Sequence, residues 1–472
     1  MEEVRLCVYC GHLNDLSGGS RCANCWLSLG AARLLPRVEA EQIAREKRFR
    51  YLRIKIIRRS LLTITIVSLL LWFVIAQNNL SSVIWPPNPA TTNLNASTSA
   101  SSWSQFRNGT RNTGYVSDDA PNPTRVLWTY ESSRPLVASP AVVDDRVYLA
   151  TEDGRTIALN RFTGDLIWEH VTGFPSSSTP AVSESLVVSV TRPGLITALE
   201  TETGNLVWDL DLKEPVLASP IIADGTLYVG SSDSHVYALD VVSGEPRWSF
   251  DAGDWVTSAI AYAEGDLIIT SQEHIVRVVN DRWGRQRMMY DTGRGRPTPG
   301  GAAIQGDLAY LGSYGGRVWA INWRQVTYPF ERALLFWKTT FYIWGISTEA
   351  PVQKGSVWSK NIGGDIPYAP AVSGNMVYAA NVQGKVVGLD SMTGEEIWWQ
   401  DLKTDITSPT TIAGDTVLIG TELGKAYGLD IGTGRIKWTF ETGGEITGSP
   451  IVSAGILFIA SQDGKLYAIS GD

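Results

Sequence analysis

Short runs of apolar residues alternate with turn residues at a fixed interval along residues 126–472 of the 472-residue chain. Within one interval, SPAVV (139–143) and RVYLAT (146–151) predict two short strands separated by a turn. The tight turn EDGR leads into a third strand, TIALN (156–160), and the turn RFTGD leads into a fourth, LIWEH (166–170). Four antiparallel strands in about 40 residues are typical of a β-propeller blade.

Two series of anchor positions show how often this unit recurs. Successive anchors of both series lie 40 residues apart, except for steps of 42 and 68 on either side of the fifth unit. The spacing predicts eight units, of which the fifth carries an insertion at 322–358. The aromatic position after a turn is held by Trp128, Trp168, Trp208, Trp248, Tyr290, Trp358, Trp398 and Trp438, and the middle of an apolar strand by Tyr148, Val188, Tyr228, Ile268, Tyr310, Tyr378, Leu418 and Phe458.

The two ends of the repeat region complement each other. The last unit begins with GKLYAISGD (464–472) and lacks an aromatic strand, whereas RVLWTYE (125–131) carries Trp128 but has no first half of its own. An incomplete unit leaves a strand edge unpaired, and pairing the two halves removes that edge. We therefore expect an all-β fold over residues 103–472, an eight-bladed β-propeller that is closed by pairing of its N- and C-terminal strands.

The turn between the third and fourth strands has a recurrent sequence. It appears as ALNRFTGDLIW, ALETETGNLVW, ALDVVSGEPRW, GLDSMTGEEIW and GLDIGTGRIKW. The glycine allows a positive φ in the turn, and the indole offers a large flat surface that can wedge between blades. The pattern resembles the tryptophan-docking repeat of the quinoprotein-type (PQQ-like) β-propeller family, and SWSQFRNGTRNTGYV (102–116) resembles the lead-in of its members. The tryptophans assigned to this structural repeat are Trp128, Trp168, Trp208, Trp248, Trp358, Trp398 and Trp438.

The family includes both enzymes and binding proteins. Its alcohol and glucose dehydrogenases hold a quinone in the central funnel, and the alcohol-oxidising branch adds a disulfide of adjacent cysteines, Ca²⁺ ligands and a catalytic Asp. Residues 103–472 contain no cysteine, and most units lack the insertions that build such a site. The better resemblance is to non-catalytic, BamB-like members, which bind other proteins through loops of one face. We therefore expect no catalytic residues and no pyrroloquinoline quinone (PQQ).

All four cysteines lie within the first 25 residues, in the two short motifs CVYC and CANC. Two residues between thiolates allow one tight turn to present both sulfurs to a single ion, and two such turns complete a tetrahedral site. We expect a zinc ribbon over residues 1–35, with structural Zn²⁺ bound by Cys7, Cys10, Cys22 and Cys25. Two disulfides or free thiols are the alternative.

A basic stretch and then an apolar stretch follow the cysteines. Residues 1–59 hold 12 Lys and Arg against 6 Asp and Glu, and LLTITIVSLLLWFVIA (61–76) carries no charge. These patterns predict a basic juxtamembrane helix at 36–59 and a single transmembrane helix at 60–77, with the N-terminus in the cytoplasm. A cleaved signal peptide is the alternative. Residues 78–102 are rich in Ser, Thr, Asn and Pro, and we expect a flexible linker there.

Two features of the repeat region are candidates for binding. The stretch DRWGRQRMMYDTGRGRP (281–297) places Arg282, Arg285 and Arg287 in an otherwise acidic region, and the insertion has an aromatic-rich centre with Trp337 and Trp344. The arginines either contact lipid headgroups, an anionic glycan or an acidic partner, or form a solvated charged face. The insertion is either a helix or hairpin packed on the propeller, or an exposed anchor for a bilayer or a partner protein.

The charge balance excludes one class of partner. Residues 60–472 hold 28 Lys and Arg against 42 Asp and Glu, which is unfavourable for nucleic acid binding.

From the predicted anchor, the repeat and the family resemblance, we expect a single-pass protein of the cell membrane whose extracytoplasmic propeller is a non-catalytic scaffold for other envelope proteins or for a ligand. Two alternatives stay open: a PQQ-dependent quinoprotein dehydrogenase, and a receptor-like sensor that couples an external ligand to the cytoplasmic zinc ribbon.

Overall fold

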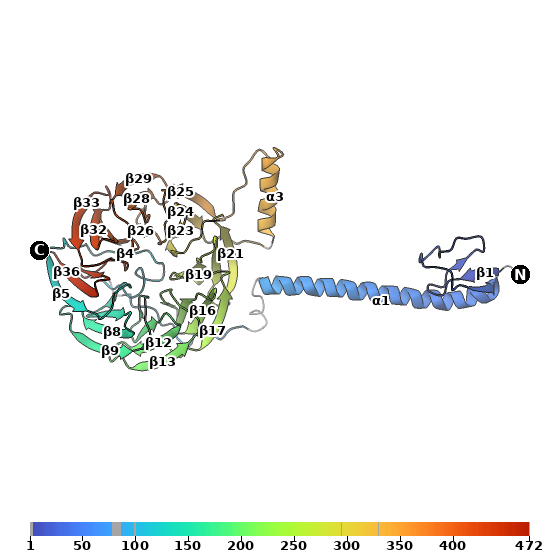
Figure 1. The fold of residues 1–472 in the computed structure, drawn as a ribbon, viewed down its shortest axis with the longest axis horizontal. Coiled ribbons are helices and arrows are strands. Elements are labelled where there is room, and N and C mark those ends of the chain that lie inside the picture. The colour runs from blue at the N-terminus through green and yellow to red at the C-terminus, as the bar shows by residue number, and fades with distance from the viewer. Residues whose placement is uncertain (1–2, 78–85, 99–100, 294, 329, 472) are drawn as a thin grey trace. The chain divides into compact units, whose positions relative to one another are not determined.

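The computed structural model describes residues 3–77, 86–98, 101–293, 295–328 and 330–471. The chain divides into two compact units, Met1–Ser81 and Ser82–Asp472. The second unit contains eight antiparallel sheets among its described residues, and they are arranged as a ring around a central axis (Figure 1). This is the propeller that the repeat predicts.

The first six blades are each built from four consecutive strands, which pair in chain order from the centre of the ring outward. They are β6 (Ala141–Val143), β7 (Arg146–Ala150), β8 (Arg155–Asn160) and β9 (Leu166–Val171); β10 (Ala181–Val182), β11 (Leu186–Val190), β12 (Leu195–Glu200) and β13 (Leu206–Asp211); β14 (Ile221–Ala223), β15 (Thr226–Gly230), β16 (His235–Asp240) and β17 (Pro246–Asp251); β18 (Ala261–Ala263), β19 (Asp266–Ile269), β20 (Ile275–Asn280) and β21 (Arg285–Asp291); β22 (Ala302–Gln305), β23 (Leu308–Ser313), β24 (Arg317–Asn322) and β25 (Ser356–Asn361); β26 (Ala371–Ser373), β27 (Met376–Ala380), β28 (Lys385–Asp390) and β29 (Glu396–Asp401).

The last two blades recruit strands from the start of the unit. The seventh comprises β30 (Thr411–Ala413), β31 (Thr416–Gly420), β32 (Lys425–Asp430) and β33 (Ile436–Glu441), and β4 (Tyr115–Val116) pairs in parallel with β30. The eighth comprises β34 (Ile451–Ser453), β35 (Ile456–Ala460), β36 (Lys465–Ser470) and β5 (Arg125–Glu131). The register of β5 on β36 places Trp128 opposite Ala468, so the predicted pairing of the two ends is present.

The burial of the strands explains their composition. The second strand of a blade is covered on both faces by neighbouring blades, and β11 and β15 are accordingly buried at every position. The fourth strand forms the outer wall and alternates, as in β9, where Trp168 is buried while its neighbours Ile167 and Glu169 are exposed. Apolar residues from adjacent blades pack together, for example Tyr148 of the first blade with Val187 of the second.

Each repeat tryptophan docks onto the following blade. The indole N–H of Trp168 donates to the carbonyl of Thr201, 33 residues later, at 2.9 Å. Its ring also covers the turn glycine Gly204, so closely that a Cβ at that position would lie 2.5 Å from the ring. Five other repeat tryptophans also donate their indole N–H to the carbonyl of the residue 33 positions later: Trp128, Trp208, Trp248, Trp358 and Trp398. The indole N–H of Trp438 has no acceptor among the described residues.

Residues 101–118, here called the axial segment, pass along the innermost strands of all eight blades. An innermost strand would otherwise present unpaired backbone groups to the central channel, and the axial segment bonds at least one such group in or directly after the innermost strand of each blade. Six blades are reached by backbone bonds: Trp103 to Val142, Ser104 to Val182, Thr110 to Tyr262, Arg111 to Ile304, Thr113 to Val372 and Gly114 to Ile412. The other two are reached by side chains, Gln105 to the N–H of Ile222 and Asp118 to the N–H of Ala454.

Arg107 fixes the axial segment from within. Its side chain is buried, and its guanidinium donates to the carbonyls of Pro370 at 2.6 Å, Thr410 at 2.9 Å and Asn112 at 3.2 Å. Burial lowers the pKa of Arg107 to about 9, so the side chain stays charged at neutral pH. The cation is held entirely by backbone dipoles of the axial segment and of two adjacent blades.

Part of the predicted flexible linker, 78–102, is bound to the propeller instead. Ala96 forms a β-bridge with Ser183, and the backbone N–H of Thr91 donates to the carboxylate of Asp240 at 2.8 Å. Leu94 and Ala96 pack into the core between the second and third blades. These contacts hold residues 86–98 along the ring surface, and residues 78–85 and 99–100 lie outside the described residues.

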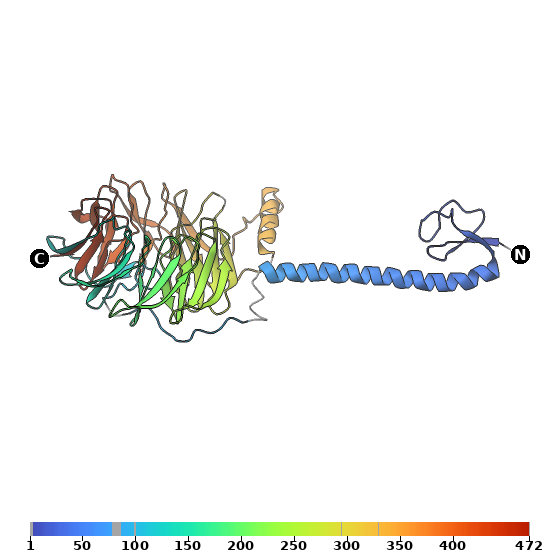
Figure 2. The same cartoon turned by 60° about the horizontal axis from the view of Figure 1, so that its bottom comes forward.

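The insertion of the fifth blade forms a helix, α3 (Glu331–Ile343), between β24 and β25. It stands outside the ring in both views (Figure 1, Figure 2). The insertion is therefore a helix, as one interpretation of the sequence expected. Its apolar side chains are largely exposed and not packed on the propeller, as the other interpretation expected.

The first unit combines a small sheet with a long helix. Strands β1 (Glu3–Leu6), β2 (Leu13–Asn14) and β3 (Arg33–Pro36) pair in the order β2-β1-β3. Helix α1 (Arg37–Gln77) then runs for 41 residues, and its first turns pack on the sheet through the buried Ala40 and Ala44. The predicted basic helix at 36–59 and the apolar run after it are thus one continuous helix.

The prediction of a transmembrane helix at 60–77 is corrected by the structure. The described side chains of the apolar run are those of residues 61–72, and all of them are exposed. Within the described ranges, no helix is long and apolar enough to cross a membrane.

Candidate metal centre and propeller mouth

The structure brings the four cysteines together. Their sulfur atoms all lie within 4.8 Å of one another, with Cys7 and Cys25 3.7 Å apart and Cys10 and Cys22 3.5 Å apart. Cys7, Cys10 and Cys22 are buried, and Cys25 is half-buried. Four thiols converging on one point form a donor set that could hold a metal ion, and thiolate ligands in tetrahedral array suit zinc.

Two similar backbone turns present these thiols. In the first, the N–H of Gly11 donates to the carbonyl of Cys7, and in the second the N–H of Trp26 donates to the carbonyl of Cys22, both at 3.0 Å. The residue after the second cysteine of each motif is left-handed, with φ of 69° at Gly11 and 59° at Trp26. Gly11 packs against α1, where a Cβ would lie 2.6 Å from the side chain of Lys47.

The thiols differ in acidity because their surroundings differ. Burial raises the pKa of the Cys10 thiol to about 12. Burial also acts to raise the pKa of Cys22, but the backbone N–H groups of Cys25 and Asn24 outweigh it and lower that pKa to about 6. The side-chain amide of Asn14 points its N–H at the Cys22 sulfur at 3.7 Å. Asn14 therefore supports one ligand from outside the four-sulfur cluster.

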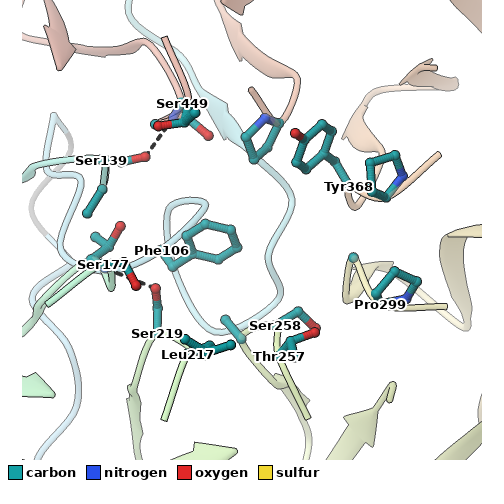
Figure 3. A pocket seen from close by; sticks show the side chains of 18 of the residues that line it. Phe106, Ser139, Ser177, Leu217, Ser219, Thr257, Ser258, Pro299, Tyr368 and Ser449 are labelled. Atoms are coloured by element: carbon teal, nitrogen blue, oxygen red, sulfur yellow. Dashed lines mark hydrogen bonds between the residues drawn. The ribbon is translucent and has the colours of Figure 1, made fainter. Parts of the chain in front are cut away.

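The propeller has a pocket at one mouth of its central channel (Figure 3). The cavity has a volume of about 310 Å³ and is lined by residues from all eight blades. Phe106 of the axial segment lies at its centre in the view of Figure 3. Any molecule bound in this pocket would therefore contact Phe106 of the axial segment.

Hydroxyl groups and apolar atoms line the mouth, and none of its lining residues is charged. Several hydroxyls tie neighbouring blades together: Ser139 accepts from the N–H of Ser449 at 2.7 Å, and Ser219 accepts from the N–H of Thr179 at 3.0 Å. The phenol of Tyr368 donates to the carbonyl of Thr407, and burial raises its pKa to about 12. The lining thus offers neutral hydrogen-bonding groups and no side chain that titrates near neutral pH.

These residues do not fit the cofactor that the quinoprotein resemblance raises. PQQ carries three carboxylates, and a site for it needs cationic partners and, for Ca²⁺, oxygen ligands such as carboxylates. The lining of the mouth contains no cationic side chain and no carboxylate. No reaction step through a quinone is therefore derived from this pocket.

The structure separates the three arginines that the sequence marks for binding. Arg282 and Arg285 both stack on the ring of Trp283, at 4.9 and 5.4 Å. Arg287 is engaged within the propeller, where it pairs with Asp266 at 2.8 Å and donates to the carbonyl of Arg324. Arg287 thus has a structural role, because its contacts connect β21 to the first residues of the insertion.

Trp337 and Trp344 lie on and just after α3, and their exposed fractions are 52% and 65%. They lie apart from the mouth, since neither lines the pocket. The metal centre, the mouth and the insertion are therefore separate features of the chain.

Sequence reasoning missed a set of exposed apolar residues beside the mouth. Phe174, Leu217 and Trp255 occupy successive loops that join the fourth strand of one blade to the first strand of the next. Their exposed fractions are 47%, 41% and 55%, and the residues that follow them, such as Thr257 and Ser258, line the pocket. The sequence does contain a signal for them. Each is an apolar residue in an otherwise polar loop, at a position that the repeat consensus does not specify.

Comparison with known proteins identifies a matching family. The sequence profile described as "Outer membrane protein assembly factor BamB" matches three overlapping segments, residues 110–176, 163–350 and 337–472. Together these segments cover most of the chain and the whole ring except the first part of the axial segment. No curated protein sequence matches the chain.

Solved structures share the fold at low sequence identity. BamB from Moraxella catarrhalis is 16% identical, with a TM-score of 0.60 over 73% of this chain and 97% of that one. Quinohemoprotein alcohol dehydrogenase from Comamonas testosteroni is 12% identical, with a TM-score of 0.61 over 79% and 81%. The computationally designed protein Ika8 is 16% identical, with a TM-score of 0.59 over 73% and 99%. An assembly factor, an enzyme and a designed protein share this architecture, so the likeness shows the fold alone.

Proposed function

Because the chain belongs to the family described as outer membrane protein assembly factor BamB, we propose that it is a non-catalytic scaffold that binds protein partners in the cell envelope. The observation that carries the proposal is the chemistry of the mouth. Its lining is uncharged and rich in hydroxyls, and apolar residues stand exposed on the loops around it.

Such a surface suits a segment of another protein. Serine and threonine hydroxyls can donate to and accept from a peptide backbone, and an apolar rim around them resembles the centre of a protein interface. Leu217 and Trp255 are the residues we assign to this contact, because both are exposed next to the pocket. Aromatic residues such as Trp255 are also enriched among those that dominate binding energy.

A photo-crosslinking experiment tests the scaffold proposal. A photoreactive phenylalanine analogue placed at Leu217 or Trp255 should crosslink to envelope proteins in cells. The matched controls are Leu206 and Ile436, which have exposed fractions of 48% and 45% but lie on outer strands away from the mouth. The proposal predicts adducts from the mouth positions and none from the controls. Adducts from the outer strands alone, or from no position, would contradict it.

The absence of enzyme activity belongs to the proposal and is supported by the lining of the mouth. We expect no dye reduction when the purified protein is mixed with PQQ, Ca²⁺ and a panel of primary alcohols and sugars. Turnover that depends on PQQ would reverse this part of the proposal, and a crosslinking result from the mouth would be unaffected by it.

The location of the propeller outside the cytoplasm is likewise proposed, because the matching family is that of an outer membrane protein assembly factor. Protease added to spheroplasts should then digest the propeller without lysis, and a cytoplasmic marker protein should survive the same treatment. Protection of the propeller until lysis would contradict the location.

We also propose that the cysteine cluster binds Zn²⁺ as a structural ion. Four thiolates fill a tetrahedral shell and leave no open position for a substrate or water, so the ion would stabilise the small sheet and not act in catalysis.

A further inference from the structure

Helix α3 ends in a regular capping pattern, whereas its N-cap residue, Phe330, is left-handed and makes no side-chain capping bond. At its start, the carboxylate of Glu331 accepts from the backbone N–H of Tyr328 at 2.9 Å. At its end, Gly345 is left-handed with φ 71°, and the N–H of Ile346 reaches back to the carbonyl of Phe341 at 2.9 Å. This closing pattern stops a helix cleanly. Local sequence therefore sets where this 13-residue helix ends.

One face of α3 is a continuous apolar surface. Leu334, Trp337, Phe341 and Trp344 follow the spacing of three and four residues that places side chains on one side of a helix. The ring centres of Trp337 and Phe341 are 6.1 Å apart, and those of Phe341 and Trp344 are 6.5 Å apart. We call these four residues the aromatic face.

The aromatic face is exposed, and the opposite side of the helix is covered only in part. The exposed fractions of the face are 58% at Leu334, 52% at Trp337, 41% at Phe341 and 65% at Trp344. On the opposite side, Leu335 and Thr339 are partly covered, whereas Phe336 and Ile343 have exposed fractions of 63% and 74%. A helix this short gains most of its stability from packing of its apolar side. No hydrophobic core cluster of the described residues includes a side chain of α3.

The charge around α3 is opposite in sign to that of the rest of the propeller. The insertion (322–358) and the adjoining stretch 281–297 together hold 9 Lys and Arg against 4 Asp and Glu, in a region with an acidic excess overall. The two stretches meet in the structure, because Thr327 donates to the carbonyl of Arg287. Lys338 is exposed on the helix, and Lys354 lies over the ring of Tyr328 at 4.8 Å. An aromatic surface with a cationic margin therefore complements an anionic surface.

A lipid bilayer matches this chemistry better than a folded protein does. Tryptophan and tyrosine side chains favour the boundary between headgroups and acyl chains, and lysine beside them is attracted to anionic headgroups. Further exposed apolar residues, Tyr328, Phe330 and Ile346, lie beyond the aromatic face. A fluid apolar phase can cover residues that point in several directions, whereas a protein groove covers one face. At about 20 Å, α3 is suited to lie in the surface of a bilayer.

We propose that α3 is a membrane-surface helix that inserts its aromatic face among the headgroups and upper acyl chains of an anionic bilayer. This goes beyond the scaffold function, which concerns the mouth, and would hold the propeller against a membrane while the mouth stays accessible. The exposed aromatic residues and the local positive charge are the observations that carry it.

Vesicle flotation tests the proposal on residues 82–472, which form a compact unit containing the complete ring and the axial segment. This unit lacks the exposed apolar residues of α1, so they do not contribute to the measurement. The unit should float with phosphatidylcholine vesicles that contain phosphatidylglycerol, and bind at least tenfold less to phosphatidylcholine alone. The double variant Trp337→Ala/Trp344→Ala should lose at least tenfold in partitioning, and Lys338→Glu should lose binding mainly to the anionic vesicles.

The double variant Trp399→Ala/Ile436→Ala is the matched control. These residues have exposed fractions of 59% and 45% and lie on outer strands, so lipid binding should not change. Equal thermal unfolding midpoints would show that both double variants are folded. Failure of the unit to bind vesicles, or equal binding by the two double variants, would overturn the proposal.

Two further measurements separate lipid from other occupants. In the reconstituted full chain, lipids brominated near the headgroup should quench tryptophan fluorescence, and Trp337→Ala/Trp344→Ala should remove part of that quenching. A lipid-free dimer, or an acidic protein partner, that is lost in this variant without any vesicle binding would contradict a bilayer as the occupant. The mouth crosslinks do not involve α3, so the two proposals can fail separately.

Discussion

At the scale of single residues, the contact between a tryptophan and the turn glycine of the next blade repeats around the ring. Gly164, Gly204, Gly244, Gly394 and Gly434 each combine a positive φ with an indole that lies where a Cβ would be. A substitution there meets two obstacles at once, because the backbone conformation disfavours L side chains and the space is already filled. The indole N–H bond to a carbonyl of the same turn makes the contact directional.

Alanine at one of these glycines should destabilise the propeller more than its backbone conformation alone explains. In Gly204→Ala, the new Cβ lies 2.5 Å from the Trp168 ring, so we expect a loss of about 2–4 kcal/mol. Gly173→Ala is the control, because Gly173 has a similar φ of 76° but nothing within 4 Å of its Cβ position, and it should lose only about 1–2 kcal/mol. Denaturant unfolding of the two variants measures the difference. Equal losses would mean that the indole contact is not tightly packed.

At the metal centre, the role of Asn14 can be separated from that of the ligands. Cys10→Ser should abolish stoichiometric zinc, measured by mass spectrometry of the purified full chain. Asn14→Ala should keep the zinc but bind it about 10–100-fold more weakly in a chelator competition, because the N–H that faces the Cys22 sulfur is lost. His12→Ala is the control, since His12 is outside the four-sulfur cluster. If His12→Ala weakened zinc as strongly as Cys10→Ser, the ligand set would be wrong.

At the scale of elements, the axial segment is bonded to all eight blades. Each innermost strand has one neighbour within its blade, and the axial segment supplies a backbone or side-chain acceptor on the other side. Arg107 strengthens this arrangement by binding carbonyls that come before β26 and β30. The segment therefore seals the inner edges of the sheets and carries Phe106 into the mouth.

Replacing Arg107 should loosen the ring from its centre. In Arg107→Met, the buried carbonyls of Pro370 and Thr410 lose their donors, which we expect to cost about 2–4 kcal/mol of unfolding free energy. Arg111→Met is the control from the same segment, because Arg111 is half-exposed and only pairs with Glu264 at 3.8 Å, so its loss should stay below about 0.5 kcal/mol. Similar unfolding midpoints for the two variants would contradict a structural role for Arg107.

The elements that the sequence predicts well are those in which side chains recur. The blades and the pairing of β5 with β36 follow from tryptophan, glycine and apolar strand positions that repeat at a fixed interval. The path of the axial segment could not be predicted, because it binds mainly through backbone groups that leave no side-chain pattern. The same holds for residues 86–98, where a composition typical of a linker hides specific bonds such as that of Thr91 to Asp240.

The candidate sites also differ in how well the sequence predicts them. The spacing of the cysteines predicts their convergence, since two tight turns are enough to build the cluster. Arg287 looks like its neighbours in the sequence, yet its tertiary contact with Asp266 distinguishes it from Arg282. The transmembrane prediction relied on an apolar run and its basic flank, and no helix in the described part of the chain is long and apolar enough to cross a membrane.

At the scale of the whole molecule, the ring is closed by strands from the two ends of the repeat region. Tyr467 of β36 lies opposite Thr129 of β5, a separation of 338 residues along the chain. In the seventh blade, the equivalent pair is Tyr427 and Thr439, which are only 12 residues apart. The two pairs have the same position relative to the repeat tryptophan, so they differ in chain separation and not in local geometry.

Disulfides at these two pairs test whether closure joins the ring into one cooperative unit. Directly opposed residues of antiparallel strands have Cα atoms close enough for a disulfide, so Thr129→Cys/Tyr467→Cys and Tyr427→Cys/Thr439→Cys should both form one. A cross-link lowers the entropy of the unfolded chain in proportion to the logarithm of the loop that it closes. For loops of 338 and 12 residues, this predicts about 3 kcal/mol more stabilisation from the closure disulfide. Denaturant unfolding of residues 82–472, oxidised and reduced, measures both effects without the native cysteines. A closure disulfide that fails to form, or that stabilises no more than the local one, would mean that the eighth blade opens before the rest of the ring unfolds.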